Sequence, residues 1–171
     1  MSFFKKTFGG TDKKPAIEKP DIDGLLMSGD TDKLIIELDT YINKICDYGA
    51  FLEKLNQPQK IFYFNQQLER EINNGGFDQY FVNSSGGFAH ETVLSLIEIG
   101  ANKTADILQL AIDEFPDSIV SKEELERREI MENFEEKTGQ VWNQLDEKFL
   151  AYEDNLYELN LLFIKQNLIY F

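Results

Sequence analysis

The chain has 171 residues, of which 42% are hydrophobic and 13% aromatic. That length suffices for one sizeable hydrophobic core, and that apolar share excludes wholesale disorder. With 17 basic and 31 acidic residues, the formal net charge is −14. A surface of this sign repels phosphate backbones, so we expect no direct nucleic-acid binding by the folded domain and expect its partners to be basic proteins.

Cys46 is the only cysteine and His90 the only histidine. An intramolecular disulfide and a zinc site of the usual Cys/His kind are therefore excluded, and we predict no cofactor. A single thiol suits a reducing cytoplasm. No apolar run approaches the roughly 20 residues that cross a bilayer, so we predict a cytoplasmic protein without a membrane span.

The beginning of the chain differs from the rest. Residues 1–29 mix lysine, glycine and proline with few periodic apolar positions, which predicts a flexible N-terminal arm. From residue 30 the pattern changes to helical spacing, and we predict one domain over 30–171.

Apolar residues at intervals of three and four predict the helices, which we place at 31–48, 58–74, 91–99, 103–115 and 121–134, with one or two more over 141–168. Asp30 and Asn102 are predicted N-caps, Ser121 with Glu124 is a predicted capping box, and Gly139 is a predicted break. No sustained alternation of β-branched residues occurs. The predicted class is all-α, a single compact multi-helix domain of six to eight helices.

Residues 71–88, EINNGGFDQYFVNSSGGF, surround an aromatic cluster with glycine and asparagine. A phosphate-binding loop is excluded, because the stretch follows a helix and contains no lysine at the spacing that such loops need. Gly75 or Gly76 can adopt the left-handed conformation that ends a helix, and Phe77, Tyr80 and Phe81 then fall on one turn. We predict a helix, a corner and a second helix.

This stretch carries a resemblance. The string NNGGFDQYFVNSSG, followed by LSLIEIGANKTADILQLAIDEFP and WNQLDEKFLAYEDNLYELNLLFIKQN, resembles the bacterial DNA-mimic protein family, a helical domain otherwise catalogued as of unknown function. The resemblance spans roughly residues 40–170, and its structural motif comprises Asn74, Gly75, Gly76, Phe77, Gln79, Tyr80, Phe81, Asn83, Ser84, Ser85 and Gly86. It implies an all-α fold.

The named member of that family is an acidic, dimeric protein described as imitating the charge surface of duplex DNA to occupy a basic DNA-binding regulator. The resemblance therefore implies a homodimer and a basic partner. The acidic positions that mimicry needs are not part of the motif, so they have to be sought in the charge pattern.

Residues 113–136 contain ten acids and three bases. Glu123 with Arg127, and Glu124 with Arg128, are i,i+4 pairs that we expect to cancel. Four glutamates then remain on one predicted helix face, spanning about 15 Å with about one charge per 5 Å, against about 3.4 Å per phosphate along a DNA strand. With a second row nearer the C-terminus, the predicted partner-binding face comprises Glu126, Glu129, Glu132, Glu136, Asp146, Glu147, Glu153 and Asp154.

Our functional hypothesis is a non-enzymatic acidic binding protein that mimics DNA. The alternative is an immunity-type or adaptor protein that binds one specific partner through shape and apolar contacts. An acidic row at helical spacing is also typical of an ordinary solvated face. An enzyme, which we do not predict, would need a pocket near the glycine corner, formed by Asp78, Gln79, Tyr80, Asn83 and His90.

Overall fold

The computed structural model describes residues 17–134 and 136–171. These residues form eight α-helices and no strand, which confirms the predicted all-α class. The helices are α1 (Ile22–Ser28), α2 (Thr31–Ile45), α3 (Gln57–Val82), α4 (Ala89–Glu98), α5 (Asn102–Ile112), α6 (Glu124–Glu132), α7 (Glu136–Leu150) and α8 (Leu156–Gln166). Short 3-10 turns lie between them, including η1 (Leu52–Lys54) and η2 (Ser84–Phe88).

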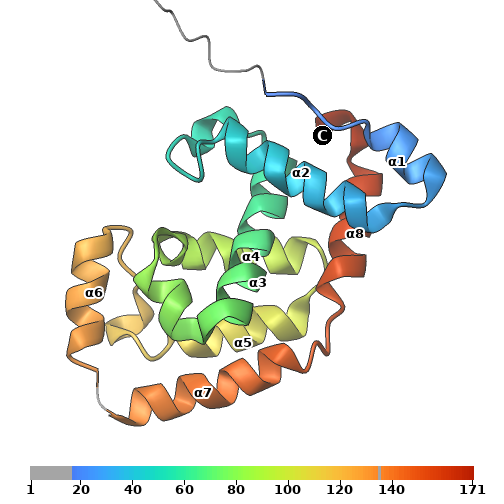
Figure 1. Cartoon of the computed structure of the whole chain (residues 1–171). Helices are drawn as coiled ribbons and strands as arrows, with labels where there is room; N and C mark the ends of the chain where they lie inside the picture. The colour runs from blue at the N-terminus through green and yellow to red at the C-terminus, as the bar shows by residue number, and fades with distance from the viewer. Residues whose placement is uncertain (1–16, 135) are drawn as a thin grey trace, which may run out of the picture.

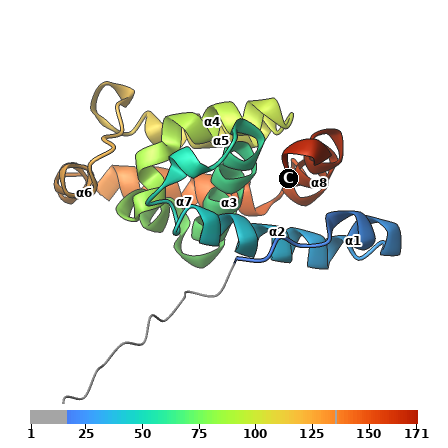
Figure 2. The same cartoon turned by 90° about the horizontal axis from the view of Figure 1, so that it is seen from above.

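Helix α3 lies at the centre of the fold (Figure 1) and contacts α2, α4, α6, α7 and α8. Seen from above, α1 and α2 lie on one side of α3, and α4 and α5 lie on the other (Figure 2). Apolar side chains along α3 face both sides, and Phe62, Leu68 and Phe81 are completely buried. Burying a side chain of this size contributes roughly 2 kcal/mol, so this helix organises the core.

The start of α3 is fixed by a reciprocal cap. The Asn56 side chain accepts from the Gln59 backbone N–H at 3.0 Å, and the Gln59 side chain accepts from the Asn56 backbone N–H at 3.2 Å. Pro58 lies in the first turn, as predicted, where its missing N–H costs nothing. The two side-chain amides also donate to the Tyr170 carbonyl, at 2.7 and 3.0 Å. The C-terminal end of the chain is thereby fastened to the central helix.

The N-terminal region departs from the prediction. Residues 1–16 of the predicted arm lie outside the described residues. Residues 22–28, which the sequence pattern assigned to the arm, form α1 instead. The Asp21 side chain caps this helix by accepting from the Gly24 N–H at 3.0 Å, and Ile22 is buried. The helix has only seven residues, too few to display a helical repeat of apolar positions.

Two predicted helix boundaries are also wrong. Asn102 does not cap α5; its N-cap is Ala101, and a carboxylate from the α7–α8 connection accepts from the Thr104 N–H instead. Gly139 lies inside α7, and the interruption falls between Glu132 and Glu136. A sequence pattern can identify a capping residue only when it lies next to the helix end. The residue that caps α5 is Asp154, which lies 50 positions away along the chain.

A cluster of aromatic rings joins α3, the turn after α5, the α6–α7 connection and α7. The Phe81 ring lies 4.9 Å from Phe115 and 5.0 Å from Trp142, and Phe134 packs against both of those rings at 5.1 and 5.5 Å. The Trp142 indole N–H donates to the Ala111 carbonyl at 3.1 Å, so its one polar atom is satisfied. This cluster fixes the position of the region from which α6 projects.

Candidate interaction surface

The glycine corner is a kink within α3. Gly76 has φ 71° and ψ −167°, a combination that only glycine adopts readily, and the helix resumes directly after it. The Phe77 N–H at the start of the resumed helix donates to Asp146 Oδ1 at 2.9 Å. A Cβ on Gly76 would collide with that same carboxylate. The predicted corner is therefore confirmed, although it is tighter than predicted because no separate loop intervenes.

The residues after the corner divide into a buried and a polar set. Phe77, Tyr80 and Phe81 are completely buried on one turn, as predicted. Gln79 and Asn83 donate their side-chain amides to the same carboxylate oxygen of a glutamate one turn before the kink, Glu71 Oε2, at 2.7 and 2.8 Å. The motif thus ties the two halves of α3 together through both packing and hydrogen bonds.

Arg127 of α6 binds the end of α3. Its Nε donates to the Phe81 carbonyl at 2.5 Å, Nη2 to the Asn83 carbonyl at 2.6 Å and Nη1 to the Ser121 carbonyl at 2.7 Å. The side chain is completely buried, and burial lowers the pKa of its guanidinium. A cation is favourable at the negative end of a helix. A Cβ on Gly86 would lie 2.9 Å from Arg127 Nε, so glycine makes room for the guanidinium.

This arrangement changes the predicted pairing on α6. No ion pair among the described residues includes Arg127, so the predicted pair with Glu123 does not form. The predicted pair of Glu124 with Arg128 is present at 2.8 Å, and Arg128 Nε also donates to the Val82 carbonyl at 3.2 Å. Both arginines of α6 therefore point toward the end of α3. The predicted capping box fails as well, because α6 begins at Glu124, after the serine that should cap it.

The predicted acidic row is only partly assembled. Glu126, Glu129 and Glu132 are exposed on α6, while Glu136 belongs to the next helix. Within α6 the three carboxylates span about 9 Å along the axis instead of the predicted 15 Å, and they spread over about 120° around it. Leu125 lies on the same outer face and is 77% exposed. Glu126, Glu129 and Glu132 therefore form a short, spread group of charges, here called the fan, and not a straight row.

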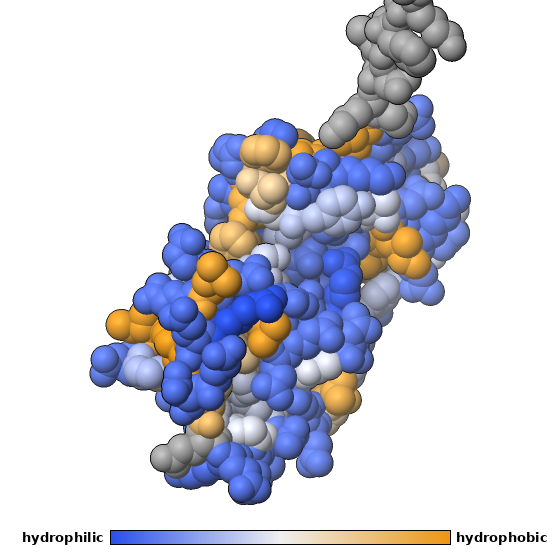
Figure 3. Space-filling model, turned by 60° about the vertical axis from the view of Figure 1, so that its left-hand side comes forward, coloured by the Kyte–Doolittle hydropathy of each residue, from blue (hydrophilic) through white to orange (hydrophobic). Residues whose placement is uncertain are grey.

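Figure 3 brings the α6 side of the molecule forward. It shows a predominantly hydrophilic surface interrupted by separate hydrophobic groups. Ile119, in the turn before α6, is 63% exposed, so apolar groups accompany the charges.

The predicted second row serves mainly structural roles. Asp146 caps the kink of α3, and burial raises the pKa of its carboxyl although the bond from the Phe77 N–H lowers it. Asp154 accepts from the Thr104 N–H at 2.8 Å and thereby caps α5. Glu153 pairs with Lys103 at 2.8 Å. Of this row, only Glu147 is exposed and outside every ion pair found among the described residues.

The polar residues considered for a catalytic pocket are Asp78, Gln79, Tyr80, Asn83 and His90, and two of them, Gln79 and Asn83, share the partner Glu71 Oε2. The buried Tyr80 hydroxyl donates to Thr92 Oγ1 at 3.1 Å. His90 Nε2 accepts from the Val120 N–H at 3.3 Å, and Asp78 is exposed. Tyr80 and His90 therefore do not join Gln79 and Asn83 at one shared point.

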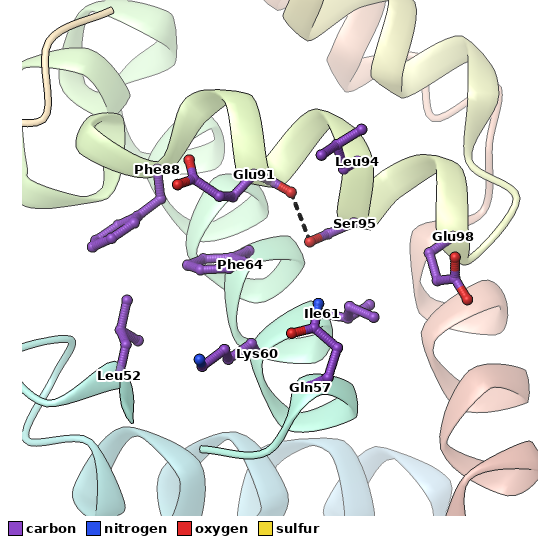
Figure 4. A pocket seen from close by; sticks show the side chains of 10 residues that line it. All are labelled: Leu52, Gln57, Lys60, Ile61, Phe64, Phe88, Glu91, Leu94, Ser95 and Glu98. Atoms are coloured by element: carbon purple, nitrogen blue, oxygen red, sulfur yellow. Dashed lines mark hydrogen bonds between the residues drawn. The ribbon is translucent and has the colours of Figure 1, made fainter. Parts of the chain in front are cut away.

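A hollow of about 430 Å³ lies between η1, the start of α3 and α4. In Figure 4 the rings of Phe64 and Phe88 face it, and their centroids are 5.3 Å apart in a stacked arrangement. Lys60 and Glu98 add charges at its rim, and Leu94 is 67% exposed beside it. The sequence gives no indication of this hollow, because its lining comes from three elements with no shared motif.

Within the described ranges, 17–134 and 136–171, no group of three or more His, Cys, Asp or Glu side chains is placed to hold a metal ion. A search of the helices in the same ranges finds none with the length and apolarity that crossing a bilayer requires.

Comparisons with curated proteins and with solved structures gave no match. The family model described as DMP19-like protein matches residues 53–167, which is more than half of the chain. The matched segment includes the kink of α3, the arginine contacts at its end and the α6 helix. This agrees with the resemblance based on the NNGGFDQYFVNSSG string. The chain belongs to the DMP19-like protein family.

Proposed function

We propose that this protein is a non-enzymatic acidic binding protein that acts as a DNA mimic, and that the α6 carboxylates occupy the basic nucleic-acid-binding surface of a protein partner. The observation that carries the proposal is the direction of the charges on α6. Both arginines of the helix bind backbone carbonyls at the end of α3. Glu126, Glu129 and Glu132 remain exposed on the outside, without an ion pair among the described residues.

This separation has an electrostatic consequence. A helix with mixed charges on one face would present little net field, whereas α6 presents carboxylates outward, buries Arg127 and pairs the partly exposed Arg128 with Glu124. Such a field steers a cationic partner and raises its association rate. The partner that fits is a basic DNA-binding regulator. A homodimer, as in the named member of the family, is part of the same proposal and would bring a second copy of the fan.

The test compares two triple variants with equal charge changes. In the first, Glu126, Glu129 and Glu132 are changed to Gln; in the control, Asp23→Asn, Asp106→Asn and Glu158→Gln neutralise three exposed acids on other helices. Immobilised protein is used to retain basic DNA-binding proteins at low and at high salt. Three rim charges of about 0.5 kcal/mol each predict roughly tenfold weaker binding for the α6 variant.

The control variant should stay within about twofold of the original protein, because its charges lie away from the contact. High salt should reduce the binding of the original protein and of the control alike. Equal losses in both variants, or retained proteins that are not basic, would contradict the proposal.

The second candidate is an adaptor that binds one specific partner through apolar contacts, and the hollow in Figure 4 favours it. Phe64, Phe88 and the exposed Leu94 offer apolar surface there, and the charged residues of the lining are Lys60, Glu91 and Glu98. Such binding would be insensitive to salt and would be lost on Leu94→Glu while surviving the α6 variant.

A further inference from the structure

A second, more polar groove lies between the α2–α3 connection, the middle of α3 and the turn before α6. Its volume is about 630 Å³, within the range of ligand sites. Its lining includes Ser84 and Ser85 of the glycine motif and Tyr48 and Gly49 of the α2–α3 connection. The groove is thus formed where the family motif meets the α2–α3 connection.

The Tyr63 hydroxyl in this groove has no hydrogen-bond partner among the described residues. The side chain is 5% exposed, and a Cβ on Gly49 would lie 2.7 Å from the hydroxyl oxygen, which places that oxygen at the groove wall. The oxygen is accessible within the groove, because the fully buried side-chain atoms without a partner in the described part of the chain are Asn65 Oδ1 and Glu91 Oε2 and not this one. It is therefore available to accept a hydrogen bond from a ligand. The adjoining backbone is also unusual, since Asp47 and Tyr48 have φ of 49° and 55°. Such left-handed non-glycine residues concentrate at functional sites.

Glu71 supplies a carboxylate to the same groove. Its Oε2 is held by the amides of Gln79 and Asn83, and its Oε1 takes part in no hydrogen bond within the described part of the chain. The polar residues of the glycine motif therefore fix one oxygen of a carboxylate and leave the other available. Gln79 and Asn83 thus orient the Glu71 carboxylate in the groove, in addition to joining the two halves of α3.

The charges around the groove favour a cation. Both bases that line it are already paired: Arg70 binds Asp39 at 2.5 Å, and Lys122 pairs with Glu91. Of the three acids, Glu124 pairs with Arg128, but Glu71 and Glu123 belong to no ion pair found within 17–134 and 136–171. The uncompensated charge is negative, and the rings of Tyr48 and Phe88 lie in the same lining.

We propose that this groove receives an arginine side chain from a basic protein partner, whose guanidinium donates to Glu71 and to the Tyr63 hydroxyl. The inference deepens the proposed function and rests on it. A guanidinium offers several donors in one plane and stacks on aromatic rings, both of which the groove can use. Lysine carries the same charge but has neither the planar donors nor the stacking surface.

The test is to titrate the full chain with short peptides and to monitor binding by the NMR chemical shifts of the backbone amides. The probes are a blocked Gly-Gly-Arg-Gly-Gly peptide and its lysine counterpart. We expect shifts at the amides of Gly49, Glu71 and Ser85, and at least about threefold tighter binding of the arginine peptide. Inorganic phosphate serves as the anionic probe; shifts at the same amides with phosphate in place of the arginine peptide would overturn the inference.

Two variants examine the contacts themselves. Tyr63→Phe removes an unpaired hydroxyl and should leave the unfolding temperature unchanged or higher, while it weakens peptide binding about threefold. Glu71→Gln keeps an acceptor for the two amides and should weaken binding about tenfold. Glu147→Gln, an equal charge change on α7, should have no effect. Unchanged affinity in both groove variants, or equal affinity for the two peptides, would contradict the inference.

The two proposals can fail separately. If the groove variants still capture basic proteins in a manner that depends on α6, the groove assignment is wrong and the proposed function stands. If the arginine peptide binds the groove but no basic DNA-binding protein is retained through α6, the proposed function is wrong instead.

Discussion

The glycine corner and the α6 helix use polar residues in opposite ways. In the corner, the side-chain amides of Gln79 and Asn83 donate hydrogen bonds to a neighbouring carboxylate, and the aromatic residues are completely buried. On α6, three glutamates remain exposed, both arginines bind the end of α3, and Glu126 accepts from the Ser121 hydroxyl at 2.6 Å. The corner determines the position of α6, and the exposed residues of α6 determine the charge of this part of the surface. A family motif therefore identifies the frame, while the surface charges have to be examined residue by residue.

The largest effect is expected from a substitution that removes the contacts between α6 and the end of α3. Arg127→Leu leaves three backbone carbonyls without their charged donor, and we expect the free energy of unfolding to fall by about 3 kcal/mol or more. Urea denaturation measures this. Arg128→Leu is the matched control on the same helix; its side chain is partly exposed, so a loss within about 1 kcal/mol is expected. Similar losses in the two variants would show that burial of Arg127 is unimportant.

A smaller effect is expected within the corner. Gly76→Ala forces a side chain into a positive-φ conformation and against the Asp146 carboxylate, and we expect a loss of about 2–3 kcal/mol. Gly139→Ala is the control, because nothing lies within 4 Å of the added Cβ inside α7. There alanine should stabilise the helix by about 0.5–1 kcal/mol. Thermal unfolding compares the two, and a neutral Gly76→Ala would refute the tight corner.

The smallest effect concerns pH. Burial raises the pKa of the Asp146 carboxyl above its unfolded value, so the folded state holds this proton more tightly. The resulting stabilisation is complete below the unfolded pKa of about 3.9 and is lost as the pH rises through the folded pKa.

Asp146→Asn should therefore flatten the dependence of unfolding free energy on pH in this acidic window. Glu147→Gln, the adjacent exposed position, should leave the dependence as it is in the original protein. Urea denaturation at several acidic pH values measures the slope, and parallel curves for the original protein and Asp146→Asn would argue against a raised pKa.

Most of the helices, though not α1, and the corner could be predicted because they depend on nearby residues. Asp30 caps α2 by accepting from the Lys33 N–H at 3.3 Å, as its position predicts. Phe77, Tyr80 and Phe81 share a buried turn because their spacing requires it. Here three residues or fewer separate the partners.

The roles of the acidic residues could not be predicted in the same way. Asp146 and Asp154 cap helices whose starts lie 69 and 50 positions away along the chain, so their sequence neighbours contain no sign of it. Arg127 suits an i,i+4 pair equally well by spacing, but the carbonyls at the end of α3 hold it more strongly. Which carboxylates remain unpaired therefore depends on contacts between residues that are distant in the sequence and meet only in the folded chain. The groove at Tyr63 is likewise formed by residues that are distant in the sequence.

Arg127 is attached to the end of α3 through main-chain oxygens only, the carbonyls of Phe81 and Asn83. Every amino acid supplies the same carbonyl, so the attachment does not depend on which side chains occupy the positions that accept it. The outward-facing positions of α6 contribute nothing to that attachment. Substitutions at those outer positions can thus change the charge of the surface while the helix stays where it is.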